Sequence, residues 1–98
     1  MKYLLITDIK TKLSDAQVMM IAEVRTKKLI KVEGLTKKSF VYDRNNSIYH
    51  EIYEFDSEES LRSYVKTNFA NNVAEEYKTT EPVKIRIMRV LKEQKNDK

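Results

Sequence analysis

The chain has 98 residues, of which 41% are hydrophobic and 35% charged, a length and balance that predict one globular domain and exclude a second hydrophobic core. It contains no cysteine, which excludes disulfides, thiolate metal sites and cysteine nucleophiles. The net charge of +4 comes from 19 basic and 15 acidic residues that are interspersed along the chain, so we do not expect a nucleic-acid-binding surface.

The first predicted element is a strand over residues 2–9. Its two alternate sets of side chains, both mostly apolar, are Tyr3, Leu5, Thr7 and Ile9, and then Leu4 and Ile6. The apolar run at the N-terminus ends at Thr7 and is too short for a secretion signal, and no later stretch is long enough to cross a membrane. We therefore expect a soluble cytoplasmic protein.

An amphipathic helix is predicted to run from Ser14, a favourable N-cap, to Gly34, a residue type common just beyond a helix C-terminus. Gln17 stands three residues after Ser14, as in a capping box. The helix face repeats every three or four positions, at Val18, Ile21, Ala22, Arg25, Leu29 and Val32. Three more apolar residues, which predict contact with a second neighbouring element, are Met19, Met20 and Val24.

Residues 36–55 are typical of a β-hairpin, with strands over 36–44 and 47–55 joined by an Asn-Asn turn. In the second strand Tyr49, Glu51, Tyr53 and Phe55 alternate with Ile48, His50, Ile52 and Glu54. A strand with one solvated face carries apolar side chains on the other face only, so this strand is expected to be covered on both faces. Phe40 and Tyr42 lie on the edge strand and are expected to point away from the other aromatic residues.

A second helix is predicted after the hairpin. Asp56 is the expected N-cap, and Glu59 stands three residues later. The apolar positions of this helix are Leu61, Tyr64, Val65, Phe69, Val73 and Tyr77. Asn71 and Asn72 are expected to break it near the middle.

The last predicted strand follows Pro82 and spans residues 83–91. Residues 92–98 are expected to form a frayed tail, so the single domain spans residues 1–91. The order strand, helix, strand, strand, helix, strand is the ferredoxin-like βαββαβ plan, an α+β fold with a four-stranded antiparallel sheet. This plan places the first and third strands, which are apolar on both faces, at the centre of the sheet.

Two helices cover only one face of such a sheet. The residues expected on the other face are Leu4, Ile6, Ile48, His50, Ile52 and Met88. An exposed aliphatic patch of this kind is unusual for a monomer, so we expect a homodimer in which a second copy of the sheet covers this face. Lys84 and Arg86 share the face and are expected to reach its rim.

Three segments resemble the dimeric α+β barrel superfamily, and most closely its small monooxygenase-like proteins of the YdhR type. The segments are IYEFDSEESLRSYV at 52–65, KVEGL at 31–35 and EPVKIRIMRV at 81–90, which resemble a strand-to-helix junction, the turn after the first helix and the last strand of that family. The resemblance implies a dimer in which two sheets face one another. It also implies that oxygenation without a metal, flavin or nucleotide cofactor is compatible with this fold, although the superfamily includes unrelated reactions.

The chain departs from two branches of that superfamily. Haem-degrading members use an Asn on the first strand, a Trp near the end of the third and a His on the second helix. The matching positions here are Thr7 and Phe55, and residues 57–79 contain no His, so haem breakdown is not expected. Where the YdhR-type proteins carry paired glycines, this chain has His50 and Glu51, so a contact made there by a glycine backbone is not carried over.

His50 is the only histidine, so one chain cannot supply a metal site with two histidines. Two interpretations stay open for this residue: a general base, or a polar group at the dimer interface that meets its twin or a carboxylate. It has no evident orienting partner in the sequence, which favours the interface.

Aromatic residues of the sheet and the second helix form the candidate ligand site. Its predicted lining is Thr7, Tyr49, Tyr53, Phe55, Phe69 and Tyr77. Such a cluster either lines a pocket for a flat, partly polar molecule or packs as ordinary core, and the sequence favours neither. With a single glycine in the chain, glycine-rich phosphate-binding and dinucleotide-binding loops are excluded, and no cofactor is expected.

The favoured function is that of a small homodimeric, monooxygenase-like protein that binds or oxidises a small aromatic molecule without metal or flavin. A non-catalytic dimer that binds a metabolite or another protein is the alternative that the sequence does not separate from it. RNA recognition motifs share this order of elements, but their third strand needs a basic residue, a small residue and two residues that stack on bases. This chain has Ile48 at the basic position, Glu51 at the small position, and His50 and Ile52 at the stacking positions. RNA binding is therefore the third hypothesis.

Overall fold

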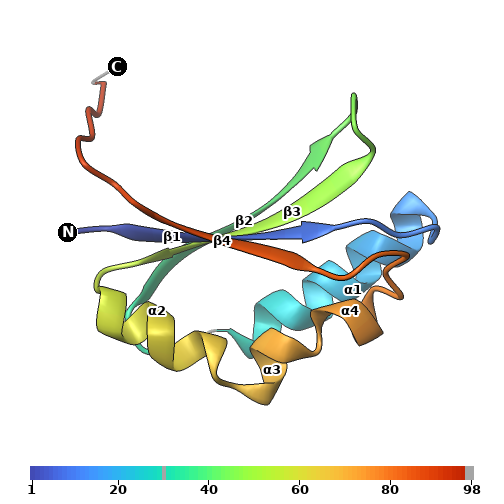
Figure 1. Ribbon diagram of the computed structural model, residues 1–98, viewed down its shortest axis with the longest axis horizontal. Helices are drawn as coiled ribbons and strands as arrows, with labels where there is room; N and C mark the ends of the chain where they lie inside the picture. The colour runs from blue at the N-terminus through green and yellow to red at the C-terminus, as the bar shows by residue number, and fades with distance from the viewer. Residues whose placement is uncertain (30, 97–98) are drawn as a thin grey trace.

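Four strands form one antiparallel sheet in the computed structural model, which describes residues 1–29 and 31–96 (Figure 1). The strands are β1 Tyr3–Ile9, β2 Leu35–Asp43, β3 Ile48–Phe55 and β4 Lys84–Arg89. Their order in the sheet is β2-β3-β1-β4, with β1 and β3 at the centre. The predicted ferredoxin-like α+β fold is therefore confirmed.

The helices all lie on one face of this sheet (Figure 1). They are α1 Asp15–Lys28, α2 Glu58–Val65, α3 Asn68–Asn71 and α4 Val73–Glu76. The capping box predicted at the start of α1 is confirmed: the Ser14 hydroxyl accepts from the Gln17 amide, and the Gln17 side chain accepts from the Ser14 amide. Of the tail predicted over 92–98, residues 97–98 lie outside the described residues, and 92–96 have no regular structure.

The end predicted for the first helix was wrong. α1 ends at Lys28 with Leu29 as C-cap, several residues before Gly34. Gly34 lies instead at the entry to β2 with a φ of +79°, and its carbonyl accepts from the Asp56 amide at 2.9 Å. A Cβ at this position would lie 2.3 Å from the Ser60 Oγ, so glycine is needed for the close approach of this turn to α2.

The predicted cap of the second helix was wrong by one residue. Ser57, and not Asp56, is the N-cap of α2, and its hydroxyl accepts from the Ser60 amide at 3.1 Å. The Asp56 amide already bonds to Gly34, which keeps this residue in the turn.

The predicted interruption of the second helix is present, but the helix breaks twice. The first break follows Val65, where Thr67 caps α3 by accepting from the Ala70 amide. The Asn71 side chain donates to the Val65 carbonyl at 3.1 Å, so it bonds to the backbone that the helix would otherwise use. The second break is at Asn72, which separates α3 from α4.

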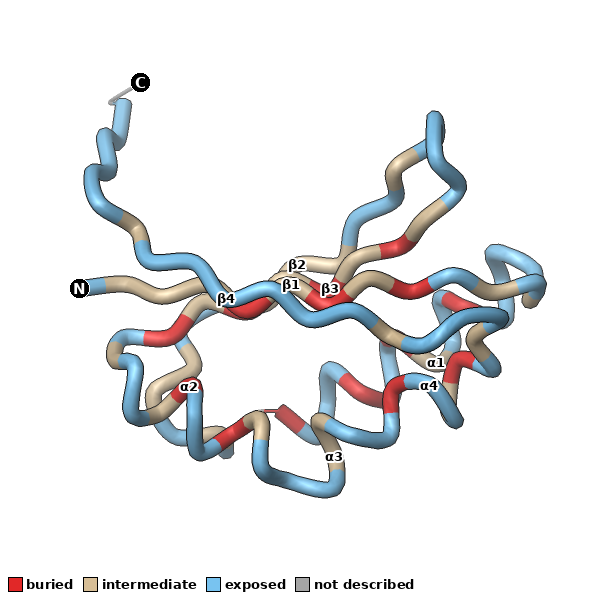
Figure 2. Tube along the Cα trace, in the orientation of Figure 1, coloured by how far each residue is buried: buried red, intermediate tan, exposed pale blue. Residues whose placement is uncertain are grey.

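Buried and half-buried residues alternate along the central strands (Figure 2). On the helix side Leu5, Ile9, Tyr53 and Phe55 are at most 2% exposed and form the core with the helices. The even-numbered residues of β1 and β3 are half-buried on the other face, which we call the open face. The facing predicted for both strands is therefore confirmed.

The expectation for Phe40 and Tyr42 was wrong. Tyr42 pairs with Tyr49 in the β2–β3 register, and their rings lie 4.6 Å apart on the helix side. Phe40 packs between Tyr49 and Tyr77, with ring centroids at 5.6 and 5.9 Å. Side chains that are paired across two antiparallel strands lie on the same face of the sheet, so pairing with Glu51 and Tyr49 of β3 places Phe40 and Tyr42 on the helix side.

Candidate functional site

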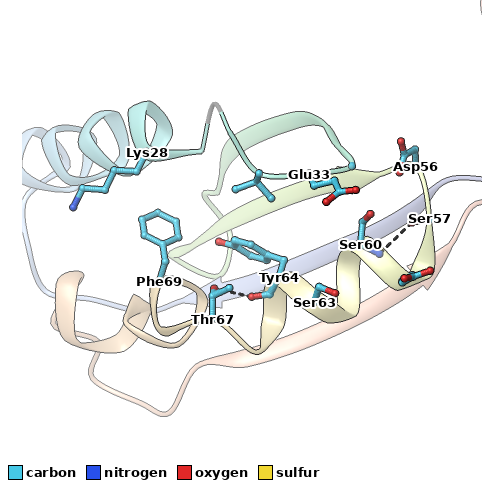
Figure 3. A pocket seen from close by; sticks show the side chains of 12 residues that line it. Lys28, Glu33, Asp56, Ser57, Ser60, Ser63, Tyr64, Thr67 and Phe69 are labelled. Atoms are coloured by element: carbon cyan, nitrogen blue, oxygen red, sulfur yellow. Dashed lines mark hydrogen bonds between the residues drawn. The ribbon is translucent and has the colours of Figure 1, made fainter.

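A cleft of about 640 Å³ lies between α2 and the segment that joins α1 to β2 (Figure 3). Two breaks in the helical layer create it: α1 ends early at Lys28, and the second helical segment turns after Val65. The side chains and backbone that line it belong to Lys28, Val32, Glu33, Gly34, Asp56, Ser57, Glu59, Ser60, Ser63, Tyr64, Thr67 and Phe69. This volume is in the range of sites that hold small organic molecules.

The two ends of the cleft differ in chemistry (Figure 3). Tyr64 and Phe69 give one end an aromatic surface, with ring centroids 6.4 Å apart in an edge-on arrangement. The other end, beside the N-terminus of α2, carries Glu33 and Asp56 together with serine hydroxyls. An occupant with one flat apolar part and one polar part matches this division.

Tyr64 carries a buried polar group beside the cleft. The residue is 5% exposed, and its buried hydroxyl has no hydrogen-bond partner among the residues that the structure describes. Burial raises the pKa of Tyr64 to about 12, so the side chain keeps its proton at neutral pH. The hydroxyl is therefore a donor, and it is not available as a base.

Behind Phe69 lies a buried charged cluster, which we define as Arg25, Lys38, Glu51, Tyr53, Glu76 and Tyr77. Arg25 and Glu51 are both 0% exposed, and the Arg25 Nε donates to Glu51 Oε2 at 2.9 Å. Glu51 also accepts from the Tyr53 hydroxyl at 2.6 Å, and Arg25 Nη1 donates to Glu76 at 2.7 Å. The guanidinium lies 4.1 Å from the centre of the Phe69 ring, so the cluster supports one wall of the cleft.

The charges of this cluster shift the pKa values of its members. Burial by itself lowers the pKa of Arg25, but the charge and hydrogen bond of Glu51 outweigh burial and raise it. Burial lowers the pKa of Lys38, whose Nζ lies 3.5 Å from Glu51 Oε2, and the neighbouring Arg25 charge acts in the same direction. The two cations and the two carboxylates balance, which allows charged groups to be fully buried here.

The buried charged cluster was not predicted from the sequence, although two signals for it were present. Arg25 stands on the apolar face predicted for the first helix, and Glu51 stands among the aromatic residues on the inward face of β3. Opposite charges on two faces that are both predicted to be buried indicate an ion pair, because an unpaired charge there is costly. Which elements meet is a tertiary property that neither pattern contains.

The structure places the predicted ligand-lining residues in two different environments. Phe69 is the one predicted residue that lines the cleft. The other five are at most 8% exposed. Four of them belong to the packed hydrophobic core, Tyr49, Tyr53, Phe55 and Tyr77, and Thr7 is a buried polar residue. Tyr49 is tied further to α1, since its hydroxyl donates to the Asp15 carboxylate.

The open face carries the residues predicted for the dimer interface. By register, Leu4 pairs with Met88 and Ile6 with Ile52, and Ile48 and His50 share this face. His50 has an orienting partner that the sequence did not indicate: its Nδ1 lies 2.8 Å from the Asp8 carboxylate. Asp8 also accepts from Arg86 at 2.9 Å, so the three residues form a polar cluster on the aliphatic surface.

The aromatic residues of β3 point toward the helices, and not toward the open face where an RNA recognition motif stacks bases. Among the described residues, no three His, Asp or Glu side chains are grouped so that they could hold a metal ion. No helix in the same residues is long and apolar enough to cross a membrane.

The chain is similar in fold to several solved bacterial and archaeal proteins. A conserved protein from Methanosarcina mazei Go1 is 16% identical, with a TM-score of 0.72 over 90% of this chain and 91% of that one. A "putative antibiotic biosynthesis monooxygenase" from Caulobacter crescentus is 9% identical, with a TM-score of 0.73 over 93% and 91% of the two chains.

The third similar structure is SnoaB, a cofactor-independent oxygenase from Streptomyces nogalater. It is 8% identical to this chain, with a TM-score of 0.74 over 94% of this chain and 95% of that one. No family model matches the sequence, and no curated protein is significantly similar to it. At these identities the likeness is one of fold: the chain has the fold of antibiotic biosynthesis monooxygenase-like proteins.

Proposed function

We propose that this protein is monooxygenase-like and takes a small aromatic molecule in the cleft between α2 and the α1–β2 segment. The observation that carries the proposal is the cleft itself: a space of about 640 Å³ with Tyr64 and Phe69 at one end and hydroxyl and carboxylate groups at the other. A mostly preformed concave site with a few polar groups is the usual form of a small-molecule site.

The reaction we propose is an oxygenation that needs no metal or flavin. An electron-rich aromatic substrate loses a proton from a methylene carbon, and its own electrons reduce O₂. One oxygen atom becomes the new carbonyl oxygen, and the other leaves as water. The carboxylates of the cleft that are available to accept the proton are Glu33, Asp56 and Glu59, since Tyr64 keeps its own. The shared fold with SnoaB, a cofactor-independent oxygenase, supports this chemistry.

The homodimer is part of the same proposal. The open face exposes Val41 and Met88 to 39% and 43%, and the half-buried Ile6, Ile48 and Ile52 continue the same surface. A second copy of the sheet would remove this aliphatic surface from water. His50 and Asp8 would then lie at the interface. The YdhR-type relationship and the cytoplasmic location stay predictions from the sequence.

The binding step is tested with a panel of quinols and flavonoid-like compounds. We expect at least one compound to raise the melting temperature and to change the tyrosine fluorescence. Ser63→Trp, which fills the cleft from an exposed position of α2, should abolish both effects, whereas Lys66→Trp at the end of α2, outside the cleft, should not. Binding that survives Ser63→Trp would contradict this site. Consumption of O₂ by the wild-type protein with a bound quinol tests the reaction separately.

A non-catalytic binding protein is the second candidate, and one observation favours it. The single His of the chain lies on the open face, across the sheet from the cleft, and the cleft tyrosine is held in its protonated form. Tight binding of a quinol without O₂ consumption above the rate in buffer would support this candidate over the oxygenase.

A further inference from the structure

The charge of the cleft is opposite to that of the whole chain. The chain carries +4, but the charged residues that line the cleft are Glu33, Asp56 and Glu59 against Lys28 alone. The three carboxylates are not in ion pairs with any residue that the structure describes, whereas Glu54 and Glu58, on either side of Asp56 in the sequence, each have a cationic partner. The cleft therefore concentrates negative charge on a basic protein.

The positions of these charges divide the cleft. Figure 3 shows Glu33 and Asp56 together at the end beside the N-terminus of α2, and Lys28 at the opposite end beyond Phe69. The turn that carries Glu33 is joined to the start of α2, because the Gly34 carbonyl accepts from the Asp56 amide at 2.9 Å. This hydrogen bond keeps Glu33 and Asp56 at the same end of the cleft.

A second observation also indicates an occupant. Tyr64 lines the cleft, is 5% exposed and has a hydroxyl without a partner among the described residues. A buried hydroxyl without a hydrogen bond is unfavourable, and because this hydroxyl is covered by its neighbours, an occupant of the cleft would satisfy it only by displacing the surrounding side chains.

We infer that the cleft selects an aromatic molecule that carries a protonated amine, with its ring at the Tyr64–Phe69 end and its ammonium group at the Glu33–Asp56 end. This inference rests on the proposed function, because it names the class of molecule that the same cleft binds. An ammonium group fits better than a metal ion, since no three carboxylates in the described part of the chain converge as a metal requires. Three carboxylates disfavour a carboxylate or phosphate ligand at the same end.

Three probes with the same ring test the inference: phenethylamine, phenethyl alcohol and phenylacetate. Their affinities are measured by titration, with the backbone amide NMR signals of Gly34, Ser60 and Phe69 as reporters of the cleft. At low salt we expect phenethylamine to bind about ten-fold more tightly than the alcohol, and phenylacetate to bind most weakly. The preference for the amine should shrink at high salt, because the rim of the cleft is open to solvent.

Matched variants locate the preference. The double variant Glu33→Gln with Asp56→Asn should bring the amine-to-alcohol ratio close to one while the affinity for the alcohol stays unchanged. Glu75→Gln, an exposed carboxylate outside the cleft, should leave the ratio as in the wild type. A wild-type protein that binds the alcohol or phenylacetate as tightly as the amine overturns the inference, and so does a ratio that survives the double variant.

The proposed function fails in a different way. If the quinol panel and all three probes leave the reporter amides and the melting temperature unchanged, the cleft is not a binding site and both ideas fall. If quinols bind at the cleft and phenethylamine does not, binding at the cleft stands and the preference for an amine is overturned.

Discussion

The two faces of the central strands differ in how deeply their polar side chains are buried. On the helix side, Glu51 is fully buried and is bonded to Arg25 and Tyr53. On the open face, the neighbouring His50 is half-buried and is bonded to Asp8, which a partly exposed arginine also contacts. A charged side chain that is removed from water needs its charge balanced and hydrogen-bonded by protein, whereas one at a half-exposed surface is also stabilised by water. One strand therefore carries a buried ion pair on one face and a half-exposed polar cluster on the other.

The largest expected effect comes from a substitution on the open face. Ile52→Asp places a charge on the aliphatic surface twice in the proposed dimer, and each buried isoleucine contributes roughly 1.5–3 kcal/mol. We therefore expect the free energy of dimerisation to weaken by about 3–6 kcal/mol, so that the variant sediments as a monomer or unfolds. Lys66→Asp at the end of α2 is the control and should leave the assembly as it was. A wild-type protein that sediments as a stable monomer at micromolar concentration contradicts the dimer itself.

The next largest effect comes from a substitution in the buried charged cluster on the helix side. Arg25→Met leaves Lys38, 3.5 Å away, as the only cation beside the buried Glu51 among the described residues, and removing one partner of a buried ion pair typically costs about 3–5 kcal/mol. Urea denaturation should show this loss in the free energy of unfolding. The matched control is Arg62→Met, which removes an exposed pair with Glu58 and should cost at most about 1 kcal/mol. Equal losses in the two variants would mean that the buried charged cluster does not stabilise the fold.

A third effect, also on the helix side, appears at alkaline pH. The pKa of Tyr64 is raised from 10.0 to about 12 by burial, so the folded state keeps a proton that the unfolded state loses. Tyr64 therefore makes its full contribution to the free energy of unfolding below pH 10. This contribution, about 2–3 kcal/mol, is lost as the pH rises from 10 to 12. Tyr53 and Tyr77 are also buried and their pKa values are raised in the same direction.

Tyr64→Phe isolates the share of that residue. Denaturation at pH 8 should show a stability equal to or slightly above that of the wild type, because the substitution removes a buried hydroxyl without a partner. Between pH 10 and 12 the variant should lose less stability than the wild type. A steeper loss in the variant would contradict the raised pKa of Tyr64.

The smallest effect sharpens the comparison on the open face. His50→Gln removes one of the two contacts of Asp8, which keeps its hydrogen bond with Arg86 at a partly exposed position. We expect a loss of about 1 kcal/mol or less in the free energy of unfolding, measured at the same protein concentration as the wild type. A loss as large as that of Arg25→Met would show that His50 is as deeply integrated as the buried charged cluster.

The spacing of apolar residues along the sequence was sufficient to predict most of the fold. The two-faced patterns of residues 2–9 and 47–55 identified the central strands, since alternation of side chains is a local property of an extended chain. The capping box at Ser14 and Gln17 identified the start of α1 for the same reason. Helix ends were predicted less well: Gly34 and Asp56 are used to join the α1–β2 turn to α2, and that contact is not local.

The candidate site depended on tertiary structure. The sequence indicated that aromatic residues would meet between sheet and helices, and they do, but it did not distinguish the packed Tyr53 and Tyr77 from Tyr64 and Phe69 at the cleft. The cleft exists because two helical segments end where they do and leave space that side chains do not fill, a result of three-dimensional packing. The pairing of Arg25 with Glu51 was decided in the same way. Local patterns determine which face of an element is buried, and only the assembled fold determines what each buried group contacts.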